Sequence, residues 1–203
     1  MKNENFVATA NAKVNLALHV IGRRSDGLHL LDSLVAFPDI GDELSFKNAE
    51  GISLSIVGPF GGQLSREIAK KKNIIIRAAK LLQDNSNGVA IKLVKNLPLA
   101  SGIGGGSSNA AVTLKALSKL WMKTIPDLDE ILNLGADVPV CLSNQFQRMQ
   151  GVGEIRTVLK APRPMWIVLA NPGVRIPTSE IFGLLKNKEN KKLEELSNLG
   201  EQD

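Results

Sequence analysis

A glycine-rich stretch in the middle of the chain places the strongest constraint on how it can fold. Residues 98–108 read Pro-Leu-Ala-Ser-Gly-Ile-Gly-Gly-Gly-Ser-Ser, and a helix is predicted to begin at Ser107 or Ser108. Glycines let the backbone reach positive φ and approach a ligand closely, and the first turn of a helix presents unpaired N–H groups. Converging N–H groups of this kind bind anions, and the two serines would add hydroxyl donors. The stretch therefore predicts a phosphate-binding loop.

Two familiar nucleotide-binding patterns do not match these residues. A Walker A loop needs a lysine directly after its last glycine, and the dinucleotide-binding fingerprint needs a third glycine or alanine. Ser107 occupies both of these positions. The alternative interpretation is a flexible linker, but linkers seldom continue directly into a helix with a regular apolar stripe. The residues thus favour a phosphate loop of another type.

Hydrophobic spacing alternates between the periods of strands and helices along the chain. Residues 12–21 alternate between apolar and polar, which predicts a half-buried strand with Lys13 and Asn15 on one face. Further strands are predicted around residues 33–37, 43–47, 52–57, 89–94 and 165–169. Helices are predicted over residues 73–84, from residue 107 onward and over residues 127–134.

This mixture of elements indicates an α+β fold. The helix after the glycine loop should bury one stripe of apolar side chains, formed by Ala111, Leu114, Leu117 and Trp121. We place a domain boundary near residue 150, which separates a domain of residues 1–150 from a short second one of residues 151–203.

Composition argues against several classes of protein. No apolar run approaches the ~20 residues of a bilayer span, and the N-terminus lacks the apolar segment of a secretory signal. The single cysteine, Cys141, excludes an internal disulfide and lies in an apolar run typical of a core. The net charge of +5 suits anionic ligands, whereas 4% aromatic content offers little for stacking on nucleic acid. We expect a cytoplasmic protein that binds neither membrane nor nucleic acid.

The glycine loop and three further segments together resemble the GHMP kinases, and among them the diphosphocytidyl-methylerythritol kinase family. The three segments are Ala12–Leu16 with Asp26–His29, Gly135–Val140, and Asn171–Gly173 with Pro177, Thr178 and Phe182. They follow the family's order from residue 8 to about residue 183. The resemblance implies a two-domain GHMP kinase fold, with an N-terminal domain like domain 2 of ribosomal protein S5 and a ferredoxin-like C-terminal domain.

The family's third glycine-rich signature is not found before the chain ends at Asp203. We therefore expect the C-terminal domain to be incomplete and the transfer activity of the chain as given to be low.

The resemblance also implies an activity. Members of the family phosphorylate the 2-hydroxyl group of 4-diphosphocytidyl-2-C-methyl-D-erythritol with ATP, in the methylerythritol phosphate route to isoprenoid precursors. ATP and Mg²⁺ are the implied cofactors, while the ligands of the metal and the oligomeric state are left unassigned. Two alternatives stay open: another GHMP kinase, for mevalonate or homoserine, and a non-catalytic ligand sensor on the same scaffold.

Individual residues match positions with known roles in the family. Asp137 matches the catalytic base, and Lys13 matches the partner that keeps this base ionised and oriented. ATP contacts are expected from the glycine loop and from one asparagine before the first helix: Pro98, Leu99, Ala100, Ser101, Gly102, Ile103, Gly104, Gly105, Gly106, Ser107, Ser108 and Asn73. Substrate contacts are expected from Asn15, Leu28, His29, Thr178 and Phe182.

The predicted substrate side departs from the family pattern at one position. Leu28 stands where the family usually has a tyrosine, whose ring stacks on cytosine. Leucine offers apolar contact but no π face. The neighbouring His29 matches a histidine that recognises cytosine, whereas His19 matches no motif position and is expected to be structural.

Overall fold

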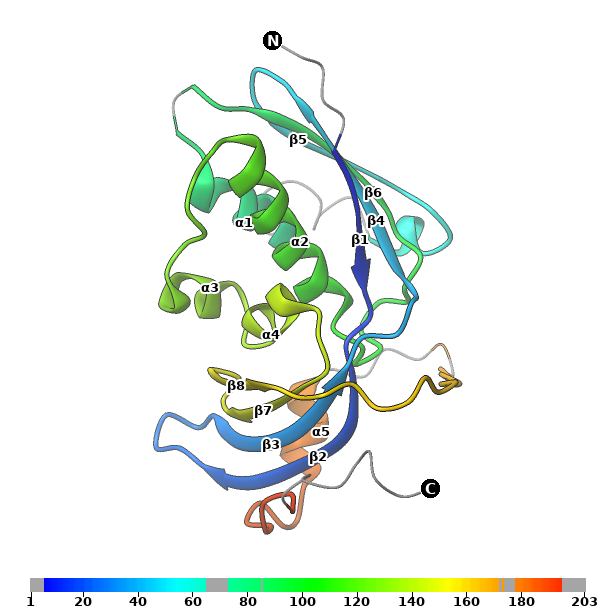
Figure 1. Cartoon of the computed structure of the whole chain (residues 1–203), viewed down its shortest axis with the longest axis vertical. Helices are drawn as coiled ribbons and strands as arrows, with labels where there is room; N and C mark the ends of the chain where they lie inside the picture. Colours follow the sequence, from blue (N-terminus) through cyan, green and yellow to red (C-terminus); the bar gives the residue numbers. More distant parts are fainter. Residues whose placement is uncertain (1–5, 65–72, 85, 172, 174–177, 195–203) are drawn as a thin grey trace.

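The computed structural model describes residues 6–64, 73–84, 86–171, 173 and 178–194, and its strands form two sheets (Figure 1). The first sheet contains, in spatial order, β1 (Phe6–Asn11), β4 (Gly41–Asn48), β6 (Val89–Val94) and β5 (Ile52–Val57). The second contains β2 (Val14–Arg23), β3 (His29–Ala36), β7 (Gln147–Gly151) and β8 (Ile155–Val158). All neighbouring strands are antiparallel except β5 and β6, which are parallel.

The helices gather mainly on one side of the first sheet (Figure 1). A short 3-10 turn, η1 (Gly61–Gln63), follows β5. The α-helices are α1 (Ile74–Leu82), α2 (Gly105–Leu120), α3 (Leu128–Leu134), α4 (Val138–Ser143) and α5 (Thr178–Leu184). Helix α2 packs against α1, α4, β1 and β4, while α5 lies beside the second sheet (Figure 1). No helix within the described ranges is long and apolar enough to cross a membrane.

The main core lies between the first sheet and helices α1 and α2. Alternate residues of β4 and β6 face these helices, and the four predicted stripe residues of α2 are all buried. The predicted apolar stripe is therefore confirmed. The largest fully buried side chains of this core are Phe46, Leu44, Ile75, Ile91, Leu93, Leu114 and Leu117.

The chain passes from the first sheet to the second between β1 and β2. The two residues at this crossing are Ala12 and Lys13, so the strand predicted over residues 12–21 is present as β2 but begins two residues later, at Val14. The crossing places Lys13 at the junction of the two sheets rather than along a strand. Lys13 is 2% exposed.

Strict alternation along β2 was also a wrong expectation. The pairing of β2 with β3 shifts register between Asn15 and Ala17, so that Leu16 is an extra residue opposite β3. A bulge of this kind moves every later side chain to the other face. Leu18 consequently lies on the same face as Asn15, and Leu16 is 40% exposed.

Several other elements differ from the sequence-based expectation. Helix α2 begins at Gly105, two residues before the predicted start, while α3 has the predicted capping box of Asp127 and Glu130 and ends at Gly135. Residues 165–169 form no strand, because none of the described strands lies beside them to supply hydrogen bonds. The remaining strands and helices that the periodicity did not predict are β1, β7, β8, α4 and α5.

The predicted domain boundary near residue 150 stays a prediction. The β7–β8 hairpin continues the second sheet across this position, with Met149 opposite Arg156.

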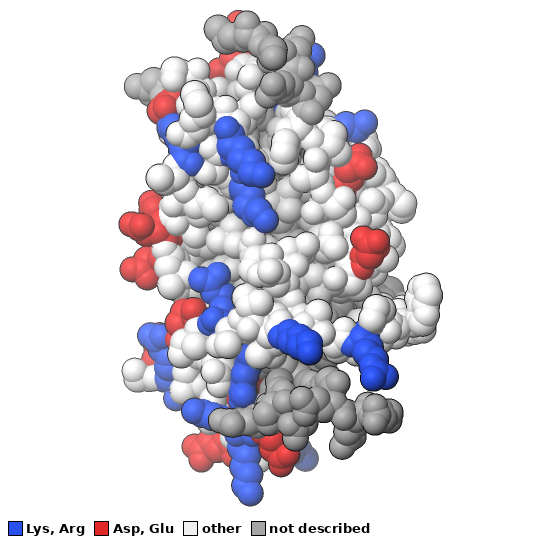
Figure 2. Space-filling view, in the orientation of Figure 1, with Lys and Arg blue, Asp and Glu red and all other residues white. Residues whose placement is uncertain are grey.

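Charged side chains are distributed along the whole length of the molecule. On the face shown in Figure 2, basic side chains form a loose column along the long axis, and acidic side chains lie nearer the edges. Uncharged surface separates most of them. On this face the net positive charge is therefore not concentrated over a single element.

Candidate active site

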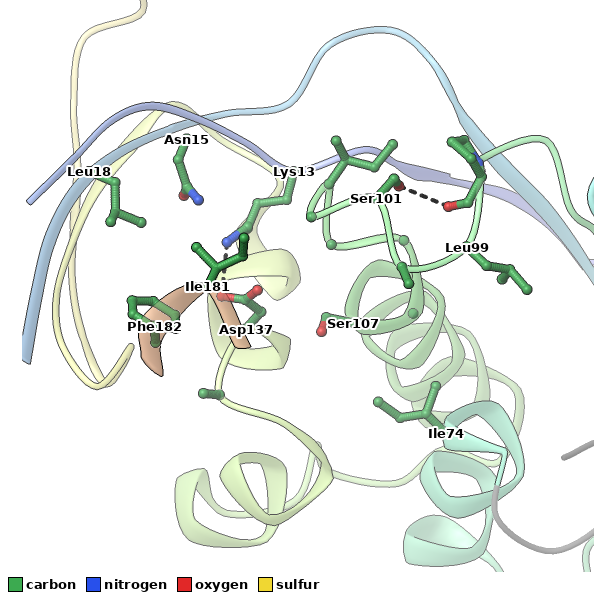
Figure 3. A pocket seen from close by; sticks show the side chains of 18 of the residues that line it. Lys13, Asn15, Leu18, Ile74, Leu99, Ser101, Ser107, Asp137, Ile181 and Phe182 are labelled. Atoms are coloured by element: carbon green, nitrogen blue, oxygen red, sulfur yellow. Dashed lines mark hydrogen bonds and ion pairs between the residues drawn. The ribbon is translucent and has the colours of Figure 1, made fainter. Parts of the chain in front are cut away.

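An ion pair joins the sheet crossing to the segment that precedes α4. The Lys13 Nζ atom donates a hydrogen bond to Asp137 Oδ1 at 2.9 Å (Figure 3). The lysine side chain is 3% exposed and the aspartate side chain is 38% exposed. The pair therefore consists of a buried ammonium group and a carboxylate that is still partly accessible to solvent.

Local structure explains why the Asp137 carboxylate is available for this contact. Gly135 ends α3, and Asp137 then occupies the N-cap position of α4, with Pro139 in the first turn. Proline at this position forms a helix readily because its φ is already helical and no partner for its nitrogen is needed. The Asp137 side chain makes no cap hydrogen bond. Its oxygens are consequently directed to Lys13 and the adjacent cavity.

The glycine loop has the backbone conformation that the sequence predicted. Ala100, Gly102 and Gly104 all have positive φ, with values of 50°, 73° and 64°. A β-carbon at Gly104 would lie 2.8 Å from the Cβ atom of Lys13, so no larger residue fits there without displacing the lysine. The N–H of Lys13 also donates to the Ile103 carbonyl at 2.8 Å. The loop and the Lys13 backbone thus fix each other's position.

A cavity of about 1090 Å³ opens between the glycine loop, the Lys13–Asp137 pair and helix α5. Ligand-binding pockets commonly have volumes of ~300–1,000 Å³, so this space is slightly larger than a typical pocket. Figure 3 shows Asn15 and Leu18 of β2, Ser107 of α2 and Phe182 of α5 arranged around it. The predicted site residues that line the cavity are Lys13, Asn15, Asn73, Asp137, Phe182 and each residue from Pro98 to Ser107.

Asn73 combines a structural contact with its place in the cavity wall. Its side chain accepts a hydrogen bond from the Ile75 N–H at 2.9 Å, which caps helix α1. This accounts for the start of the helix. The residue is 6% exposed, so only a small part of it faces the cavity.

Ser108 lies apart from the other predicted ATP contacts. It is 3% exposed, and its hydroxyl donates to the Sγ atom of Cys141 at 3.4 Å. Burial raises the pKa of the Cys141 thiol to about 12, so this thiol is protonated and unreactive at neutral pH. Both residues line a separate small cavity of about 50 Å³. Ser108 lies in the first turn of helix α2 and faces the core.

On the predicted substrate side, two rings contact each other. The His29 ring stacks on Phe182 of α5, with centroids 4.8 Å apart and planes inclined by 18°. Burial lowers the pKa of His29 below its usual value, and the charges of Arg23 and Lys188 lower it further. Leu28 is 50% exposed, and neither Leu28 nor His29 lines the large cavity. Thr178 begins α5, but its side chain, like Pro172 and Pro177, lies outside the described residues.

Sequence reasoning missed four polar residues of the cavity wall, Lys95, Asn109, Asn187 and Asn190, and His19, which was expected to be structural, also lines the cavity. Lys95 follows directly after β6, on the same alternation as the buried residues Val89, Ile91 and Leu93. This two-residue alternation was the signal in the sequence that could have placed Lys95 on the buried face. A lysine at the end of such a series is more often interpreted as the residue at which a strand leaves the core.

The described residues contain no cluster of three or more His, Cys, Asp or Glu side chains that could hold a metal ion by themselves. Oxygen donors at the cavity include the Asp137 carboxylate and the Ser107 hydroxyl. Magnesium typically takes one or two protein carboxylates together with the phosphates of its substrate. The donors present are compatible with an ion of that type only in the presence of a phosphate ligand.

Comparison with known proteins identifies relatives over most of the chain. Residues 73–145 match the family described as the GHMP kinases N terminal domain. The chain is 50% identical over 184 residues to a 4-diphosphocytidyl-2-C-methyl-D-erythritol kinase of Cereibacter sphaeroides, covering 90% of this chain and 64% of that protein. It is 44% identical over 190 residues to one of a Jannaschia species, covering 94% of this chain and 67% of the relative.

A solved structure shows the same arrangement of elements. The crystal structure of a 4-(cytidine 5'-diphospho)-2C-methyl-D-erythritol kinase aligns with a TM-score of 0.74 at 33% sequence identity, covering 93% of this chain and 68% of the other. The chain thus spans about two thirds of the length of these relatives. The extent of identity along the chain and the shared fold together show that it belongs to the 4-diphosphocytidyl-2-C-methyl-D-erythritol kinase family of the GHMP kinases.

Proposed function

We propose that the protein of which this chain forms part transfers the γ-phosphoryl group of ATP to the 2-hydroxyl of 4-diphosphocytidyl-2-C-methyl-D-erythritol. The observation that carries the proposal is the Lys13–Asp137 pair, which faces the glycine loop across one cavity. A carboxylate that can take a proton and a loop that can hold phosphates are the two components that phosphoryl transfer to an alcohol needs.

The chemistry follows from the positions of these groups. Asp137 accepts the proton of the 2-hydroxyl group as the hydroxyl oxygen bonds to the γ-phosphorus. The bond between that phosphorus and the bridging oxygen breaks, and ADP leaves with the bonding electrons. Lys13 orients the Asp137 carboxylate through the 2.9 Å hydrogen bond. Backbone N–H groups of the loop and of the first turn of α2 stabilise the negative charge on the phosphates.

The two ligands would occupy opposite ends of the cavity. Asn73 and residues 98–107 form the end assigned to ATP, and Asn15 and Phe182 lie toward the second sheet, where the substrate would bind. His29 and Leu28 would contact the cytosine ring after the His29–Phe182 stack opens, and Thr178 would contact the substrate from the start of α5. Ser108 would support the loop from within the core and not touch ATP directly.

Magnesium is expected to enter with ATP. The phosphates would supply most of its ligands, with the Ser107 hydroxyl or the Asp137 carboxylate completing the set. When bound, the ion neutralises phosphate charge and polarises the γ-phosphoryl group. We further propose that the protein acts in the cytoplasm, on a small molecule rather than on nucleic acid or membrane.

A panel of acceptors tests this function. Purified protein is incubated with Mg²⁺ and γ-labelled ATP together with 4-diphosphocytidyl-2-C-methyl-D-erythritol, mevalonate or homoserine. We expect label to appear on the first acceptor only. Preferred labelling of mevalonate or homoserine would assign another GHMP kinase activity. ATP binding without transfer to any acceptor, in both this chain and a chain of the relatives' full length, would favour a ligand sensor.

A further inference from the structure

Beneath the glycine loop lies a buried ion pair outside the groups used above. The Lys95 Nζ atom donates a hydrogen bond to Asp42 Oδ2 at 2.5 Å. Asp42 is fully buried and Lys95 is 3% exposed. Removing two charges from water is unfavourable unless the remaining hydrogen-bonding capacity of both groups is satisfied. The surroundings of Asp42 satisfy that requirement for the carboxylate.

The Asp42 carboxylate accepts three further hydrogen bonds. Its Oδ1 atom accepts from the backbone N–H groups of Asn96 and Leu97, each at 2.8 Å. Its Oδ2 atom accepts from the side-chain amide of Asn109 at 2.9 Å. Residues 95–97 lead directly into the loop, and Asn109 lies on the helix that follows it. One carboxylate thus connects the chain segment that precedes the loop to the helix that follows it.

Strand alternation explains why Asp42 and Lys95 meet. Asp42 is on the buried face of β4 together with Leu44 and Phe46. Lys95 continues the buried face of β6, whose last register pair with β4 is Glu43 with Val94. Continued by one residue, this antiparallel register would place Asp42 opposite Lys95, and their side chains meet in the 2.5 Å hydrogen bond. A charged pair therefore replaces the apolar pairs of the core at the point where the sheet reaches the cavity.

The other end of the loop has a separate attachment. The Lys13 N–H donates to Ile103, and the neighbouring Ala12 N–H donates to the Ile40 carbonyl, two residues before Asp42. The Asn96 side chain donates to the Gly41 carbonyl at 3.1 Å. The start of β4 consequently contacts both the beginning of the loop and the sheet crossing that carries Lys13.

We propose that Asp42 is a positioning residue for the glycine loop. Its carboxylate holds Lys95, Asn109 and the backbone at residues 96–97 in the arrangement that keeps residues 98–104 around the cavity, before any ligand binds. The effect of Asp42 on nucleotide affinity rests on the proposed function, whereas its effect on the loop itself does not.

Hydrogen–deuterium exchange of the unliganded protein tests the effect on the loop. In Asp42→Asn the amide oxygen can still accept from the Asn96 and Leu97 N–H groups, but its NH₂ group faces the Lys95 and Asn109 donors. We expect backbone amides of residues 97–104 to exchange about tenfold faster or more than in the parent protein. Helix α3, away from the carboxylate, should show little change.

Asp32→Asn is the matched control. Asp32 is also fully buried, and it pairs with Arg148 at 2.6 Å in the second sheet. Loss of either carboxylate should lower the melting temperature, but only Asp42→Asn should accelerate exchange in the loop. Equal loop protection in Asp42→Asn and the parent, or an equal increase in both variants, would overturn the proposal.

Titration with ATP and Mg²⁺ then separates this inference from the proposed function. Asp42→Asn should weaken ATP binding about tenfold, while Asp32→Asn should bind like the parent protein. If the parent does not bind ATP at all, the proposed function is wrong, and the exchange experiment still decides the role of Asp42. Rapid loop exchange with unchanged ATP affinity would mean that Asp42 positions the loop only when no ligand is bound. It would contradict the expected effect of Asp42 on ATP affinity.

Should Asp42→Asn fail to fold, Asn109→Ala provides the same test without leaving a buried charge unpaired. It removes only the connection from the carboxylate to α2. We expect exchange at residues 104–109 to increase about threefold or more. Unchanged exchange there would refute the proposed role of the carboxylate in joining the loop to the helix.

Discussion

At the scale of single residues, the Lys13–Asp137 contact is the centre of the proposed chemistry. The two residues are 124 positions apart in sequence, yet their side chains form a 2.9 Å hydrogen bond. The carboxylate is 38% exposed at its cavity side, where a substrate hydroxyl can reach it. This combination of a fixed partner and an accessible oxygen suits a general base.

Replacing either member of this pair should nearly abolish transfer while leaving the fold intact. Asp137→Asn removes the proton acceptor, and Lys13→Ala removes the group that orients it. General-base catalysis contributes ~10²–10⁴-fold, so we expect kcat of Asp137→Asn to fall by at least about 10². Steady-state rates and circular dichroism of an active, full-length protein check this. Asp129→Asn, an exposed acid on α3, is the control and should retain parental activity. A folded Asp137→Asn protein with most of its rate would contradict the assignment.

The His29 ring gives a second prediction, on stability and pH. Because its pKa is lowered in the folded protein from an ordinary value near 6.5, the unfolded chain binds more protons just below that pH. The contribution of His29 to the free energy of unfolding is therefore at its full value above about pH 6.5. It decreases as the pH drops through that value and below. The His29→Gln variant should lose less thermal stability than the parent between pH 7.5 and 5.5.

Melting temperatures at these two pH values measure the effect. The control is His19→Gln, since His19 is the other histidine and its Nδ1 atom contacts the Lys191 carbonyl at 2.7 Å. If His29→Gln and the parent lose equal stability on acidification, protonation of His29 does not contribute to the acid sensitivity.

At the scale of structural elements, two tight backbone turns lie against the Lys13–Asp137 pair. One is the glycine loop, in which Gly104 contacts Lys13. The other is the β7–β8 turn, in which Gly153 lies against the carbonyl of Ala136, the residue before Asp137. The glycine loop thus packs against Lys13, and the β7–β8 turn packs against the residue that precedes Asp137.

Gly104→Val should weaken ATP binding far more than substrate binding. A β-carbon would meet Lys13 Cβ at 2.8 Å, and the φ of +64° is unfavourable for a β-branched residue. Calorimetric titration should show the dissociation constant for ATP rising at least about tenfold, equivalent to about 1.4 kcal/mol. Gly51→Val, at a position with no neighbouring atoms within 4 Å, is the control. Equal losses for both ligands would mean that the loop is only structural.

Gly153→Ala should lower kcat through the position of Asp137. An added β-carbon would lie 2.5 Å from the Ala136 carbonyl oxygen, and the φ of +119° adds backbone strain. We expect kcat to fall about tenfold or more, because small misplacements of a reacting group are costly. Gly173→Ala has a similarly unfavourable φ of +77°, but its β-carbon would meet no atom of the described residues within 4 Å. Equal rates in the two variants would show that the contact with Ala136 is unimportant.

At the scale of the whole molecule, the segment from Met165 to Leu169 stands out by its exposure. Trp166 is fully exposed and Val168 is 92% exposed, although both are apolar. The segment pairs with no described strand. Large exposed apolar side chains that lie close together favour association with other molecules.

We therefore expect the 203-residue chain to associate in solution through this segment. The double variant Trp166→Ser/Val168→Ser should be more monodisperse than the parent chain in size-exclusion chromatography with light scattering. Met122→Gln changes a separate exposed apolar residue, 93% exposed, and should make little difference. A monodisperse parent chain at high concentration would disprove this expectation.

Local patterns were sufficient for much of the fold and for the phosphate loop. The strands at residues 52–57 and 89–94 and the capped helix ending at Gly135 agree with their predicted positions, because period, turn residues and caps act over a few neighbouring positions. The positive φ values at Gly102 and Gly104 agree with the glycines there in the same way, whereas the positive φ of Ala100 was not predicted. The catalytic and binding roles that resemblance assigned to individual residues stay predictions.

Only the tertiary structure decided how distant segments meet. It carried the chain from one sheet to the other at Lys13, just before the predicted first strand begins as β2, and it placed Leu18 on the cavity side through a bulge opposite β3. It also opposed Asp42 to Lys95 across two strands and brought His29 against Phe182. Register, sheet crossing and ring contacts depend on partners tens of residues away, and such partners leave no trace in local spacing. The sequence by itself therefore determined the local elements and the loop, and long-range packing determined the geometry of the site.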